Sequence, residues 1–110
     1  MPSVPEGPLE VTDVTEKTAM LSWKPPKSNG GLPLSGYIIE RRDNKRPTWV
    51  KVDKVSPDTT TYKANNMLEG NMYNYRIIAE NEEGASPALE TKEYVKPSKP
   101  AGNILPCMNI

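Results

Sequence analysis

The sequence predicts an all-β fold in which two sheets pack face to face. Apolar residues come in short runs that alternate with polar residues, as they do in strands with one buried face. Turn residues separate these runs at roughly 8–12 residue intervals, the spacing typical of a β-sandwich. The 12 prolines and 7 glycines disfavour long helices, since a proline inside a helix costs about 3 kcal/mol.

The clearest strand begins at Tyr73, in the stretch Tyr73–Pro87 around which the rest of the chain is organised. Every second residue from Tyr73 to Ala79 is aromatic or aliphatic, which predicts one buried face over Tyr73–Glu80. A polar run ending in Gly84 then predicts a turn. A tyrosine at the head of such a strand is typical of immunoglobulin-like sandwiches, where its hydroxyl bonds to backbone a few residues upstream. We therefore predict an immunoglobulin-like β-sandwich.

Six further strands complete a seven-stranded prediction. In chain order, the first strand contains Leu9 and Val11, and the second covers Ala19–Trp23. The third covers Gly36–Arg42, a short fourth Trp49–Val52, the fifth Thr60–Ala64 and the seventh Glu90–Lys96. Pro8 at the head of the first strand suits a sheet edge, because proline cannot donate to a ladder. Inward-facing positions predict a core of Trp23, Tyr37, Tyr62, Tyr73, Tyr75 and Ile77.

Loops and ends follow from the turn residues. Residues 43–47 form a charged loop, and Gly30–Gly31 lie in a loop where glycine permits positive φ. That loop lacks the Lys-Ser/Thr of a phosphate-binding loop. Proline-rich segments bound the fold, so we expect a domain over residues 5–97, an N-terminal extension over 1–4 and a disordered tail or linker over 98–110.

Composition excludes several function classes. Lys and Arg number 14 and so do Asp and Glu, which argues against nucleic-acid binding and attraction to anionic membranes. The chain has no histidine, and its one cysteine, Cys107, lies in the tail, so no base–nucleophile pair and no intrachain disulfide is expected. Three acids, Glu80, Glu82 and Glu83, match no known calcium loop. We expect no enzyme activity, no cofactor and no metal.

An ordered set of motifs runs through most of the chain. The motifs are Trp-Lys-Pro-Pro at 23–26, Asn-Gly-Gly at 29–31, Gly-Tyr-Ile-Ile-Glu at 36–40, Trp49, and Tyr-x-Tyr-Arg-Ile-x-Ala-x-Asn-x-x-Gly-x-Ser at 73–86. In this order the chain resembles a fibronectin type III domain over residues 5–97. It is most similar to the modules of giant sarcomeric proteins such as titin, twitchin and myosin-binding protein C.

The resemblance implies a non-catalytic structural and protein-interaction module of a giant multidomain muscle protein. Such a module would contribute to scaffolding and elasticity of the thick filament, in the cytoplasm at the sarcomeric A-band. Its implied partners are neighbouring immunoglobulin-like or fibronectin type III modules, with myosin or other sarcomeric proteins as candidates, and the isolated domain would be a monomer. The alternative is a ligand-binding module of a cell-surface receptor or adhesion protein, which the missing disulfide and glycosylation sequon disfavour.

The candidate partner-binding surface is a local group of cations with one aromatic residue. Its members are Arg41, Arg42, Lys45, Arg46 and Trp49. Cations of this kind either form a solvated surface, balanced by the local acids, or meet an acidic partner. Trp49 either packs on a sheet or stands as a partly exposed surface aromatic.

Overall fold

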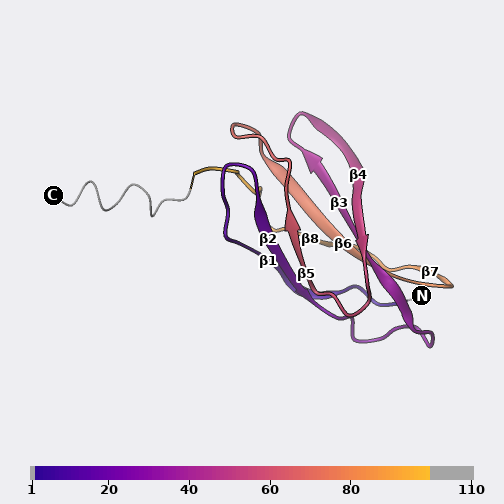
Figure 1. Ribbon diagram of the computed structural model, residues 1–110. Helices are drawn as coiled ribbons and strands as arrows, with labels where there is room; N and C mark the ends of the chain where they lie inside the picture. Colours follow the sequence, from indigo (N-terminus) through magenta and orange to yellow (C-terminus); the bar gives the residue numbers. More distant parts are fainter. Residues whose placement is uncertain (1, 100–110) are drawn as a thin grey trace.

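Residues 2–99 are described by the computed structural model, and they form two antiparallel sheets that pack face to face (Figure 1). The first sheet has the order β1-β2-β5, with bounds β1 (Glu6–Thr12), β2 (Ala19–Lys24) and β5 (Thr61–Ala64). The second has the order β4-β3-β6-β7 and comprises β3 (Leu34–Asp43), β4 (Arg46–Val55), β6 (Tyr73–Asn81) and β7 (Gly84–Ala85); β8 (Leu89–Glu90) also pairs with β6. The predicted all-β, two-sheet sandwich is confirmed. The described part of the chain contains no helix long and apolar enough to cross a membrane.

The core lies between the sheets and is centred on β6. Tyr75, Ile77 and Ala79 are each 0% exposed, because the alternation of the strand turns all three toward the opposite sheet. From that sheet Trp23 meets Tyr37 edge to face, with ring centroids 5.5 Å apart. Aromatic pairs in this arrangement add about 0.5–1.5 kcal/mol to the effect of burial.

Tyr62 is the exception among the predicted core residues. It is only partly buried and packs against the rim of the core. Its hydroxyl donates to Oδ2 of Asp53 on β4, at 3.2 Å. Burial, followed by the Asp53 carboxylate, raises the pKa of Tyr62. Tyr62 thus contacts the core as predicted but is not fully buried, because β5 lies at the edge of its sheet and the hydroxyl reaches across to β4.

Tyr73 joins β6 to the segment that precedes it. Its hydroxyl accepts a hydrogen bond from the Leu68 amide at 2.9 Å and a longer one from Nδ2 of Asn71 at 3.4 Å. Its backbone amide and carbonyl both bond to Val95, at 2.9 and 2.7 Å. One residue therefore closes the connection before β6 and holds the last segment of the domain against it.

The β3–β4 hairpin is tighter and longer than predicted. The predicted loop at 43–47 was too long and the fourth strand over Trp49–Val52 too short, because only Asn44 and Lys45 form the turn and β4 spans Arg46–Val55. Oδ1 of Asp43 accepts hydrogen bonds from the amides of Lys45 and Arg46, at 2.8 and 2.7 Å. Because Asp43 caps the turn, β3 and β4 pair directly on either side of it, with Asp43 opposite Arg46.

The last edge of the second sheet is broken into pieces. The predicted seventh strand over Glu90–Lys96 was wrong: β7 and β8 are two residues each, and Val95 makes only an isolated bridge to Tyr73. Along this edge, side-chain oxygens accept hydrogen bonds from β6 amides that backbone carbonyls would accept in a regular sheet. Oγ of Ser86 accepts from the Ala79 amide at 2.9 Å, and Oγ1 of Thr91 accepts from the Tyr75 amide at 3.3 Å. Residues 2–99 therefore form eight strands instead of the predicted seven.

The two ends of the described chain lie at opposite ends of the sandwich. The Ser3 amide bonds to the carbonyl of Ser28 in the β2–β3 connection, at 2.9 Å. The Ser98 amide bonds to the carbonyl of Thr15 in the β1–β2 connection, at 3.0 Å. These connections follow and precede β2, so they flank opposite ends of that strand, as Figure 1 shows. Pro100–Ile110, most of the predicted tail, lie outside the described residues, as does Met1.

Candidate functional site

The five predicted contact residues all lie on the β3–β4 hairpin, but they do not share one face. Successive strand residues point to opposite sides of a sheet. Arg42 lies on the outer face, whereas Arg41 lies on the side of the first sheet. Lys45 and Arg46 lie at the tip of the hairpin, and Trp49 lies on the outer face of β4. The predicted group is therefore divided among an outer cluster that includes Arg42 and Trp49, the hairpin tip with Lys45 and Arg46, and Arg41 on the core side.

The outer cluster is a stack of charged groups around Trp49. The guanidinium carbons of Arg42 and Arg76 lie 4.7 and 4.4 Å from the centroid of the Trp49 ring. Nε and Nη2 of Arg76 each lie 2.6 Å from Oε1 of Glu40. Each cation–π contact contributes about 0.5–1 kcal/mol at exposed sites. Trp49 is therefore a partly buried surface residue, and its stacking contacts stabilise three neighbouring strands, β3, β4 and β6.

Arg76 was missed by reasoning from the sequence. The outward position of Arg76 could be seen in the alternation of β6, but its neighbours depend on register across two strand pairs. Glu40 stands opposite Arg76 on one side and opposite Lys51 of β4 on the other. No spacing along the chain gives that register, because the hairpin and the β5–β6 connection both intervene.

Arg41 lies at the edge of the core and contacts the segment between β5 and β6. Its Nη1 donates to the carbonyl of Asn65 at 3.1 Å, and its guanidinium carbon lies 5.0 Å from the centroid of the Tyr73 ring. Burial raises the pKa of Tyr75, and the nearby Arg41 partly offsets that rise. These contacts tie β3 to the segment between β5 and β6, so Arg41 has a bracing role in the fold.

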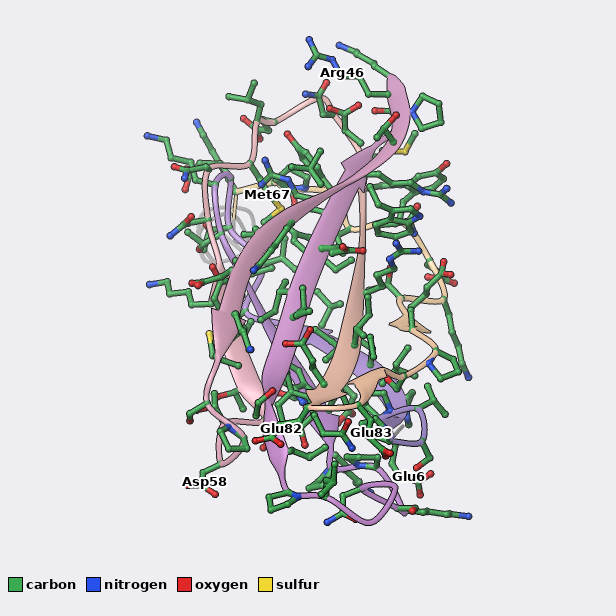
Figure 2. The ribbon with its side chains drawn as sticks, turned by 90° about the vertical axis from the view of Figure 1, so that its right-hand side faces the viewer. Glu6, Arg46, Asp58, Met67, Glu82 and Glu83 are labelled. Atoms are coloured by element: carbon green, nitrogen blue, oxygen red, sulfur yellow. The ribbon has the colours of Figure 1, made fainter. Side chains whose placement is uncertain are left out.

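Lys45 and Arg46 project from one end of the molecule. Figure 2 shows Arg46 at the tip of the hairpin and Glu6, Asp58, Glu82 and Glu83 at the opposite end. Within residues 2–99 the side chains of Lys45 and Arg46 make no ion pair, whereas Lys54 further along β4 pairs with Glu80 at 2.7 Å. The hairpin tip therefore presents two cationic side chains that no described carboxylate pairs with.

A groove of about 280 Å³ opens beside the hairpin, between β4 and the β5–β6 connection. Its lining includes the cations Arg41, Arg46 and Lys51, one acid, Asp43, and the side chains of Val50, Asn65 and Asn66. Val50 is 60% exposed, which is high for a valine in a strand that pairs with its neighbour. Guanidinium, ammonium and amide groups beside an exposed valine can hydrogen-bond the carboxylates or the backbone of a partner.

The described residues include no group of His, Cys, Asp or Glu side chains placed to hold a metal ion. Glu80, one of the three acids considered as a cation site, is engaged with Lys54. Gly30 and Gly31 have φ of 74° and 92°, so the prediction of positive φ in that loop is confirmed.

Comparison with known proteins matches residues 3–93 to the fibronectin type III domain. The chain is 38% identical to fast-type myosin-binding protein C of Mus musculus over 86% of this chain and 8% of that protein. It is also 38% identical to the titin homolog of Caenorhabditis elegans over 83% of this chain and, to the nearest per cent, 0% of that protein. A crystal structure of a multidomain fragment of titin superposes with a TM-score of 0.80 at 29% identity, covering 90% of this chain and 33% of that one.

The chain thus spans a small fraction of the relatives it matches, as one module among many would. The resemblance noted from its motifs is confirmed by both the sequence and the structural comparisons. The chain belongs to the fibronectin type III family, and it is similar to the modules of titin and myosin-binding protein C.

Proposed function

We propose that this chain is a non-catalytic structural and protein-interaction module of a giant multidomain muscle protein. In this role it contributes to scaffolding and elasticity of the thick filament, in the cytoplasm at the A-band of the sarcomere. Residues 5–97 would be the module, joined to neighbouring immunoglobulin-like or fibronectin type III modules through the segments on either side. The observation that carries the proposal is the 38% identity to modules of two such relatives over more than four-fifths of the chain.

The shape of the domain supports a place in a linear array. Its principal-axis extents are 59 × 28 × 19 Å, and the two ends of the described chain lie at opposite ends of the sandwich. A chain of such modules extends without folding back on itself. Because the segments at both ends are bonded to loops of the domain, through Ser28 and Thr15, each module would hold the direction of its neighbours.

Myosin is the candidate partner, because a relative is named for binding it. Within our proposal the contact surface comprises Arg42, Lys45 and Trp49, which lie along the outer face and tip of the β3–β4 hairpin. Charge at the rim of an interface acts mainly on association and salt dependence.

Cosedimentation with purified myosin filaments tests the proposal. We expect the chain to pellet with the filaments and the double variant Arg42→Glu/Lys45→Glu to reduce the bound fraction about fivefold or more. The matched control is Lys63→Glu, a charge reversal at an exposed position on β5 in the other sheet, which should bind as the wild type does. Absence of pelleting would reject myosin as the partner, and equal retention of both variants would reject the surface.

A further inference from the structure

The second sheet ends in a long strand edge that no other described strand covers. β4 pairs with β3 and with no other strand among residues 2–99. It is 10 residues long, whereas the edge strands β1 and β5 of the other sheet have 7 and 4 residues. An uncovered edge carries unpaired amide and carbonyl groups that can accept a further strand. β4 is therefore the longest stretch of the described fold that is open to strand addition.

The basic groove lies directly beside this edge. Thr48, Val50, Lys51 and Val52 of β4 line it on one side, and Asn65 and Asn66 line it on the other. A strand added to β4 would turn every second side chain toward the groove. There the exposed Val50 offers an apolar contact, and the side-chain amides offer hydrogen bonds. The side chains that line the groove would thus determine which sequences bind as the added strand.

The charges along this edge select an acidic occupant. β4 carries Arg46, Lys51 and Lys54 against one carboxylate, Asp53. Lys54 is paired with Glu80 at 2.7 Å, and the Asp53 carboxylate accepts bonds from Tyr62 and from the Lys54 amide. The side chains of Arg46 and Lys51 make no ion pair with any described residue. The groove, whose lining holds one acid, Asp43, and four cations, is therefore flanked by two cations that have no ion-pair partner among the described residues.

The same charges disfavour pairing of β4 with a second copy of this chain. Two β4 edges side by side would bring like charges together, and cationic edge strands are one way in which proteins prevent such pairing. We propose that the β4 edge and its groove bind an extended acidic segment of a partner protein, which adds to the second sheet as a further strand. This inference rests on the proposed function as an interaction module, and it adds a second site, separate from the outer surface of Arg42, Lys45 and Trp49, with its binding mode and the chemistry of its partner.

Titration of the isotope-labelled chain with a capped peptide of about eight alternating Glu and Val residues tests the inference, a length that covers a typical strand. NMR amide signals should shift along 48–55 and at 65–66, and amide exchange should slow on β4. The double variant Arg46→Glu/Lys51→Glu should weaken the affinity about tenfold or more, since both cations are lost from the site. The control Lys63→Glu/Lys92→Glu reverses two exposed charges away from the groove and should leave the affinity unchanged.

A second peptide separates strand addition from charge attraction alone. The same sequence with an N-methyl group on every residue keeps its side-chain charges but has no backbone donor on either edge, so it should not bind. Equal binding of the two peptides, shifts confined to Trp49 and Arg76 on the outer face, or no shifts at all would overturn the inference. If the chain pellets with myosin filaments but does not bind the peptide, the proposed function stands and this inference is rejected. If it binds the peptide but does not pellet, this inference stands and myosin is rejected as the partner.

Discussion

Replacing Tyr73 by Phe removes a single hydroxyl and tests how the fold is closed. That hydroxyl is the acceptor for the Leu68 amide at 2.9 Å, and the Asn71 amide group lies further away at 3.4 Å. The ring itself is 3% exposed and would stay in place in the variant. The substitution therefore leaves packing unchanged and deprives the Leu68 amide of its partner.

The expected loss follows from the environment of that amide. A buried group left without its hydrogen bond costs about 1–3 kcal/mol. The bond is partly buried and the Leu68 side chain is 65% exposed, so water can reach the segment in part. We therefore expect Tyr73→Phe to lower the free energy of unfolding by about 1–2 kcal/mol, and the melting temperature by about 5–10 °C for a domain of this size.

Tyr37→Phe is the matched control. Tyr37 is 0% exposed, and its hydroxyl makes no hydrogen bond with any other described residue. Removing a buried hydroxyl that has no partner should leave the free energy of unfolding unchanged or raise it by up to about 1 kcal/mol.

Guanidinium denaturation followed by tryptophan fluorescence measures both variants. The difference between them should be at least about 1 kcal/mol in favour of Tyr37→Phe. Equal stability of the two variants, or a larger loss for Tyr37→Phe, would refute the role that we assign to the Tyr73 hydroxyl.

Three further predictions concern the core and the backbone. Trp23→Ala should lower the free energy of unfolding by about 3–5 kcal/mol, because the ring is 4% exposed and packs on Tyr37; a thermal melt that matches the wild type would contradict this. Gly36→Ala should destabilise the domain in the same assay, since a Cβ there would overlap the Val55 carbonyl oxygen, and a neutral result would show that β4 can move aside. Burial raises the pKa of Tyr37 above the ordinary 10.0, so the phenol ionises at a lower pH in the unfolded chain than in the folded one, and the domain loses stability as the pH rises from about 10 through the pKa of the folded state. Denaturation at about pH 8 and about pH 11 should therefore show a smaller alkaline loss in Tyr37→Phe than in the wild type, and equal losses would contradict the assignment.

The parts of the fold that could be predicted are those with a strong alternation of buried and exposed residues. β6 shows it from Tyr73 to Ala79, and the strand was found almost to the residue. The start of β4 could not be predicted, because Arg46, Pro47 and Thr48 are all exposed and carry no apolar pattern. What extends the strand is the Asp43 carboxylate, which caps the turn.

The candidate site was predictable in composition but not in arrangement. The cations of the hairpin were visible in the sequence, yet Arg41 and Arg42 face opposite sides, and only the register of β3 shows which neighbours each one meets. The groove was harder still to predict, because Asn65 and Asn66, which line it, belong to the β5–β6 connection and not to the hairpin. Long-range pairing, and not local preference, brings these residues together.

At the groove, partner contact should be carried by residues that do not hold the fold together. Arg46 and Lys51 line the groove but make no ion pair with the rest of the described fold. Guanidinium denaturation of Arg46→Glu/Lys51→Glu tests this separation most directly. We predict a free energy of unfolding within about 0.5 kcal/mol of the wild type, as for other surface substitutions; a loss of about 2 kcal/mol or more would show that these cations hold the sandwich together.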